Sequence, residues 1–103
     1  MKTKELYDEL SAIAKAGGVT IRRESGRFKS GYCLIEEKPI IILNKIASPE
    51  YQNRVLALGI TYFKIDDIFI KPKVREFIEK ETHNNKINLF ELNIEHSDNP
   101  PDK

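Results

Sequence analysis

Two short apolar runs joined by a three-residue link constrain the fold of this chain most. They are "YCLIE" at residues 32–36 and "PIIILN" at residues 39–44, and the link "EEK" between them begins with Glu36, the last residue of the first run. Each run is apolar on both faces at its centre, so we expect it to be buried on both sides, or covered by helices on one side and by a partner on the other. A third run, "VTIRRE" at residues 19–24, alternates and is followed by the short link "SGRFKSG". Because both links are short, the sequence predicts a three-stranded antiparallel meander.

Three further segments carry apolar residues at helical spacing. Thr3 is the expected cap of the first, and Ser48 followed by Pro49 is typical of a helix start. The predicted helices are residues 4–16, 49–63 and 72–81.

The C-terminal part of the chain alternates in a different way. Residues 87–94, "INLFELNI", predict a short strand, and "HNNK" before them is expected to end the last helix. Residues 97–103 are polar and contain two prolines, which predicts a flexible tail. A chain of 103 residues is one domain by size. We therefore expect an α+β fold over residues 1–96: an N-terminal helix, the meander, two helices and a possible last strand.

The second predicted helix is apolar along two stripes. A helix of that kind packs against two neighbours, here the sheet and either another helix or a second subunit. Tyr51, Leu58 and Tyr62 lie on one stripe and are the candidate residues for self-association.

The segment "RRESGRFKSGYC" at residues 22–33 is the most basic part of the chain. Its Gly26 and Gly31 have the spacing of a phosphate-binding loop, but the Lys-Ser or Lys-Thr pair and the following helix are missing, which favours a turn between strands. Cations beside an aromatic residue also suit docking of a partner or of nucleic acid. The candidate binding residues are Arg22, Arg23, Arg27, Phe28 and Lys29.

Few residues suit catalysis or metal binding. Cys33 lies in an apolar strand, where a free cysteine is usually a small buried side chain. The two histidines, His83 and His96, have no spacing that pairs them with another ligand, and the adjacent Asp66 and Asp67 are typical of a turn. We therefore expect no catalytic residues, no metal and no cofactor.

Charge and hydropathy limit the partners. The formal net charge is +1, which gives no general attraction to nucleic acid or to a membrane surface. No apolar run is long enough for a membrane span, and the amphipathic N-terminal segment does not resemble a signal peptide. A cytoplasmic location is the simplest interpretation.

Residues 17–80 resemble a group of small uncharacterised bacterial proteins. The shared features are a glycine-flanked hairpin with a Cys-Leu strand at Cys33, an apolar strand ending in Asn44 and Lys45, a Leu-rich helix, and a closing helix that begins "PKVRE" at Pro72. The resemblance implies a shared fold and no particular activity.

The order of helix, strands, "IIILNK" and capped helix also resembles the core of small zinc peptidases found beside phage repressors. In that family the helix after the strand carries the HExxH motif. The corresponding helix here contains "RVLALGITYF", and Ala57–Thr61 would occupy the place of the motif without any zinc ligand or catalytic glutamate. This resemblance implies at most a catalytically inactive relative.

Together these observations predict a small non-enzymatic domain that binds another protein or regulates one, and that associates with a copy of itself. Nucleic-acid binding through residues 22–29 and an inactive peptidase-like domain stay open as alternatives.

Overall fold

The computed structural model describes residues 1–96 of the chain. The expected α+β class is confirmed: one helix, a three-stranded sheet and two further helices follow one another along the sequence. The elements are α1 (Thr3–Ala16), β1 (Thr20–Glu24), β2 (Gly31–Ile35), β3 (Lys38–Asn44), α2 (Pro49–Tyr62) and α3 (Pro72–His96).

The sheet is mixed, so the prediction of an antiparallel meander is wrong in its topology. The strand order is β1-β3-β2, with β3 parallel to β1 and antiparallel to β2. The strand β3 carries three isoleucines and a leucine, and in the central position its apolar side chains are shielded by neighbours on both sides. The more charged β1 takes an edge. The loop after β1 therefore crosses the end of β3 to reach β2.

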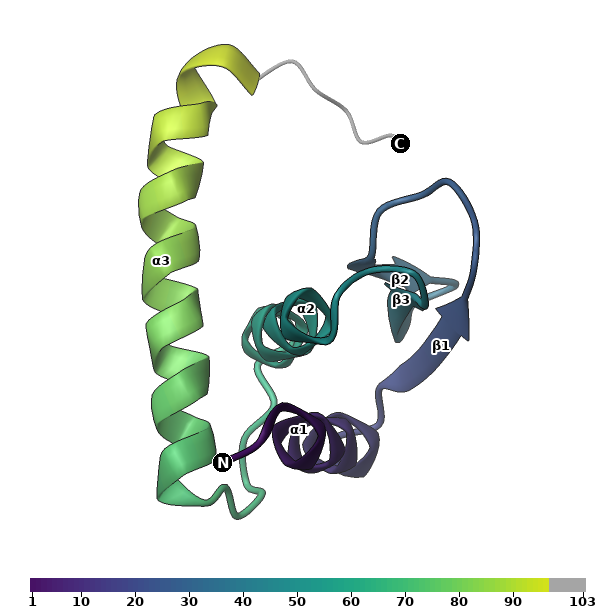
Figure 1. The fold of residues 1–103 in the computed structure, drawn as a ribbon, viewed down its shortest axis with the longest axis vertical. Helices are drawn as coiled ribbons and strands as arrows, with labels where there is room; N and C mark the ends of the chain where they lie inside the picture. The colour runs from purple at the N-terminus through teal and green to yellow at the C-terminus, as the bar shows by residue number, and fades with distance from the viewer. Residues whose placement is uncertain (97–103) are drawn as a thin grey trace.

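The described helices all lie on one side of the sheet (Figure 1). Helices α1 and α2 pack next to the sheet, and α3 packs on α1 and α2 from the side away from the strands. The core forms between these layers, and its largest fully buried apolar side chains are Leu10, Ile41, Leu43, Leu56 and Val74.

Helix α2 touches the sheet at Gly59. A Cβ atom at this glycine would lie 2.7 Å from Cδ1 of Ile41, so any larger residue would force this buried side chain to shift. The other apolar side of α2 packs on α1 and α3 of the same chain. The two apolar stripes of this helix are thus explained largely within one subunit.

The termini of the helices differ in part from the prediction. At α2 the expected cap is confirmed, because Ser48 Oγ accepts a hydrogen bond of 3.2 Å from the backbone N–H of Tyr51. At α1 the cap prediction is wrong: Thr3 is the first helical residue, and Lys2 occupies the N-cap position without a side-chain hydrogen bond.

The predicted strand at residues 87–94 and the predicted end of the helix near residue 81 are also wrong. These residues continue α3, which runs to His96. From Lys73 to His96 the sequence contains no glycine or proline, and asparagines cost a helix much less than either of these two residues. The predicted tail at residues 97–103 lies outside the described residues.

Candidate functional site

The basic loop at residues 25–30 is shaped by one buried side chain, Asn44, at the end of β3. Its Nδ2 donates to the carbonyl oxygens of Gly26, at 2.9 Å, and of Phe28, at 2.7 Å. Its backbone N–H donates to Ser30 Oγ at 2.8 Å. Because Asn44 is only 5% exposed, these bonds are shielded from competing water. The loop is therefore an anchored crossing over β3 and not the turn of a hairpin.

This role of Asn44 is not among the predictions made from the sequence. The sequence does contain a signal for it, since Asn44 is a single polar residue directly after the apolar run "IIIL". A buried amide at the end of such a strand needs hydrogen-bond partners. The identity of those partners depends on the strand order, which the sequence pattern gave wrongly.

The candidate residues of β1 point to opposite faces of the sheet. Arg22 pairs with Glu24, with 2.7 Å between Arg22 Nη2 and Glu24 Oε2. The guanidinium of Arg23 lies 5.6 Å from the centre of the Tyr7 ring of α1, in a cation–π contact. Both cations thus already have a partner within the chain, and the two partners lie on opposite faces of the sheet.

The other three candidates lie in the anchored loop. Arg27 and Lys29 are exposed, whereas Phe28 is half-buried. The Phe28 ring lies so close to Gly26 that a Cβ atom there would be 3.2 Å from it. The five predicted binding residues therefore do not form one continuous surface.

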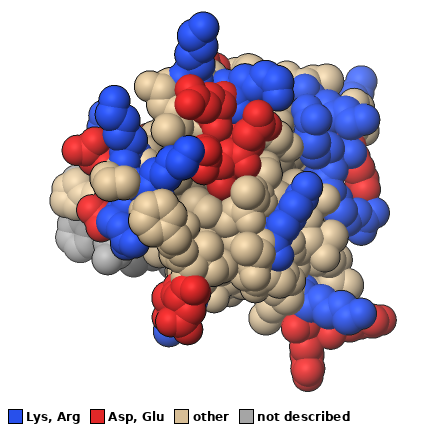
Figure 2. All heavy atoms as spheres, turned by 90° about the horizontal axis from the view of Figure 1, so that it is seen from below, with Lys and Arg blue, Asp and Glu red and all other residues tan. Residues whose placement is uncertain are grey.

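Charges of both signs share the face seen from below in Figure 2, and uncharged surface lies between them. This face does not present a broad field of positive charge. It fits the formal net charge of +1 and gives no extended track for a phosphate backbone.

The strand β2 exposes apolar side chains, which corrects the expectation that Cys33 is buried. Cys33 is exposed, and Leu34 and Ile35 are 57% and 42% exposed. These side chains are exposed because β2 lies at the edge of the sheet. Among the described elements it contacts only β3 and α2. The cross-strand neighbour of Cys33 is Ile40, which cannot accept a proton from the thiol.

An aromatic cluster lies on the helix-covered face of the sheet, to which Tyr32 and Leu34 of β2 point. The ring of Tyr62, which is 57% exposed, has its centre 4.9 Å from that of Tyr32 and 5.1 Å from that of Phe63. Burial, and secondarily the nearby Tyr62 hydroxyl, raise the pKa of Tyr32 above its ordinary value of 10.0. We call the exposed residues Cys33, Leu34, Ile35 and Tyr62 the β2 surface.

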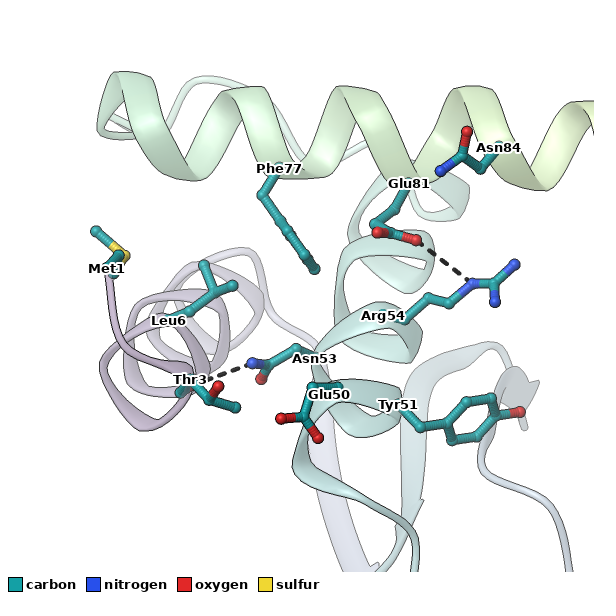
Figure 3. Close-up of a pocket in the computed structure, with 10 residues that line it drawn as sticks. All are labelled: Met1, Thr3, Leu6, Glu50, Tyr51, Asn53, Arg54, Phe77, Glu81 and Asn84. Carbon is teal, nitrogen blue, oxygen red and sulfur yellow. Dashed lines mark hydrogen bonds and ion pairs between the residues drawn. The ribbon is translucent and has the colours of Figure 1, made fainter.

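The three residues predicted for self-association are in different surroundings. Tyr62 belongs to the β2 surface. Leu58 is half-buried and does not belong to the buried core. Tyr51 is 40% exposed and lines a cleft between α1, α2 and α3 (Figure 3).

That cleft has a volume of about 650 Å³ and is polar on one side. Arg54 and Glu81 face each other across it, with 3.5 Å between Arg54 Nε and Glu81 Oε1. Asn53 Nδ2 donates to the carbonyl oxygen of Thr3 at 3.1 Å. Its polar groups thus connect the three helices to one another.

The residues considered for metal binding or catalysis are not assembled into a centre. Asp66 and Asp67 are exposed and lie in the link between α2 and α3, where Asp67 adopts a φ of 64°. Within the described part of the chain there is no cluster of three His, Cys, Asp or Glu side chains suited to a metal ion.

Comparisons with protein-family models, with curated proteins and with solved structures find no match to this chain. Among the helices described here, none is both long and apolar enough to cross a membrane.

Proposed function

We propose that this chain is a small non-enzymatic protein-interaction domain that associates with a second copy of itself through the β2 surface. The observation that carries this proposal is an edge strand whose exposed side chains are apolar. Proteins usually protect such edges with charges, because an open strand accepts another strand. Exposed apolar groups gathered on one strand are typical of an interface.

The magnitudes favour a reversible complex. Full burial of a leucine or isoleucine side chain contributes about 1.5–3 kcal/mol. Leu34 and Ile35 are 57% and 42% exposed, so each can gain roughly half of that, twice in a symmetric contact. Loss of translational and rotational freedom costs about 4–15 kcal/mol. Since the gain reaches only the lower part of this cost, we expect a weak dimer that forms at high micromolar concentration and not a permanent one.

Among the described residues, the surroundings of the exposed thiol favour a contact surface over a nucleophile. Cys33 has an apolar cross-strand neighbour, and a thiol without an adjacent base is a poor nucleophile at neutral pH. We retain a cytoplasmic location as part of the proposal, where a single exposed cysteine stays reduced.

Sedimentation velocity over a concentration series tests the proposal. We expect the wild-type mass to rise with concentration from 11.9 kDa towards twice that value. Leu34→Lys places a charge in the β2 surface and should keep the chain monomeric. The matched control is Thr20→Lys on β1, also exposed and on an edge strand, which should associate as the wild type does.

A mass of 11.9 kDa at every concentration up to the high micromolar range would contradict self-association. Binding of a DNA or RNA oligonucleotide that falls steeply with salt, and that is lost in Arg27→Ala, would instead support the nucleic-acid alternative.

A further inference from the structure

We propose that two copies of this chain pair their β2 strands antiparallel, with Cys33 facing Cys33 of the second copy across a two-fold axis. The two three-stranded sheets then join into one sheet of six strands. This inference rests on the proposed self-association and adds the strand register and the position of the axis.

The alternation of hydrogen bonds along β3 shows which backbone groups of β2 are free. The N–H of Lys45 donates to the carbonyl of Glu24, on the side of β1. The N–H of Asn44 donates to Ser30 Oγ, on the side of β2. Backbone groups alternate in direction along a strand, so Ile40 and Ile42 also point to β2. Their partners Cys33 and Gly31 are thus bonded to β3, and the N–H and C=O of Tyr32 and Leu34 point to the free edge.

The geometry of the hairpin turn independently indicates that the backbone groups of Leu34 are not bonded to β3. Ile35 pairs with Lys38 across a two-residue turn, Glu36-Glu37, whose φ angles of 52° and 68° are those of the tight hairpin turns. The pair that closes such a turn is hydrogen-bonded, so the next pair, Leu34 with Pro39, is not. Proline at this position loses nothing, since it has no N–H to donate.

In one antiparallel register the free N–H and C=O groups of both Tyr32 and Leu34 form hydrogen bonds with the second copy. It sets Tyr32 opposite Leu34 of the second copy, and by symmetry Leu34 opposite Tyr32, which allows four new backbone hydrogen bonds. Tyr32 and Leu34 share the helix-covered face with Tyr62, so this register also covers the exposed Leu34 with an aromatic ring. Between the two bonded pairs lies Cys33, opposite itself.

Charges at the two ends of β2 are complementary in the same register. The loop before β2 carries exposed Arg27 and Lys29, and the turn after it carries exposed Glu36 and Glu37. Antiparallel pairing brings the end of this basic loop near the acidic turn of the second copy, and this contact between opposite charges occurs twice. A parallel arrangement would place like charges together at each end, which is unfavourable. The basic loop thereby orients the second copy.

Oxidation of the native protein with diamide tests the register. Two thiols lose two protons and two electrons to form a disulfide, and diamide is reduced to the hydrazine. Facing residues of a non-bonded antiparallel pair have Cα atoms about 4.5 Å apart, within the range that a disulfide spans. The wild type should therefore form a covalent dimer rapidly.

The matched control carries Cys33→Ser and Ile35→Cys together, which moves the thiol two residues along the same exposed face. In the proposed register its two thiols are too far apart to join. We expect its covalent dimer to form about tenfold or more slowly than that of the wild type. Sedimentation velocity checks that both proteins associate.

Charge reversal gives a second readout that needs no thiol. Lys29→Glu alone and Glu37→Lys alone should each weaken association about threefold to tenfold, and the double variant should restore it. Equal crosslinking of the wild type and the control, in proteins that sediment as dimers, would overturn the register while the proposed function stands. Proteins that sediment only as monomers would overturn both.

Discussion

The two edges of the sheet solve the same problem differently. Within residues 1–96, both β1 and β2 have one side without a strand partner. The strand β1 ends in the charged run Arg22, Arg23 and Glu24, whereas β2 ends in Cys33, Leu34 and Ile35. Charges on an edge discourage pairing with another chain. Of the two edges, therefore, only that of β1 carries the charges that discourage pairing, and the proposed partner strand is assigned to β2.

Cover by helices strengthens the contrast. Helix α1 packs on β1, and Arg23 lies over its Tyr7 ring. The strand β2 contacts α2 mainly through the aromatic cluster of Tyr32, Tyr62 and Phe63, and Tyr62 stays more than half exposed. The strand β2, whose residues carry no charge, is therefore also less well covered by helices.

The largest expected change in the free energy of unfolding comes from a buried leucine, Leu56 of α2, compared with an exposed leucine, Leu34 of β2. Leu56→Ala should lower the free energy of unfolding by about 2–5 kcal/mol, because Leu56 is fully buried and its loss leaves a cavity. Leu34→Ala should change it by no more than about 0.5 kcal/mol, since this side chain is mostly in water. Urea denaturation of dilute protein measures both.

Leu58→Ala provides the intermediate case. Leu58 on α2 is only half-buried, so its loss should cost less than that of the fully buried Leu56. Equal losses for Leu34 and Leu56 would mean that β2 is not an open edge.

The anchor between the two edges should give the next largest effect. Asn44→Ala leaves the carbonyls of Gly26 and Phe28 without their donor and should cost about 1–3 kcal/mol. Lys45→Ala is the control, because the neighbouring side chain is exposed and its backbone bond to Glu24 is kept. Thermal unfolding separates the two variants, and equal midpoints would show that Asn44 does not hold the loop.

Local signals predicted most of the elements, and long-range pairing explains what they missed. The capped start of α2 at Ser48 and the extents of the three strands follow from sequence within about two residues. The short link "SGRFKSG" suggested a hairpin, but the observed order places the strongly apolar β3 between β1 and β2. The length of a link alone does not show which strand will take the central position.

The site was harder to predict than the fold for a related reason. "YCLIE" is apolar on both faces, and burial was expected for Cys33. Whether such a strand is buried depends on whether it lies at the centre or at the edge of the sheet, which its own residues do not encode. The same uncertainty affected residues 87–94, where alternation suggested a strand but the absence of glycine and proline favours the continuous α3.

Alkaline pH should reveal the partial cover of β2. The pKa of Tyr32 is raised in the folded state by burial and by Tyr62, so the unfolded chain loses this proton more readily. The resulting stability is complete below about pH 10, the ordinary tyrosine pKa, and is lost as the pH rises through the folded value. The wild type should therefore lose stability above pH 10 more steeply than Tyr32→Phe. Urea midpoints at several alkaline pH values measure this, and parallel curves would place Tyr32 in free solvent.

The smallest effect is expected in the basic loop, at Arg27. Its side chain is exposed, so Arg27→Ala should change the free energy of unfolding by no more than about 0.5 kcal/mol. The same variant should weaken self-association at low salt and match the wild type at high salt, because screening removes its attraction to the acidic turn of the second copy. Arg22→Ala on β1 is the control, since it removes a cation that is paired with Glu24 and distant from the second copy. Weakened association in both variants would show that net charge, and not the β2 edge, governs the contact.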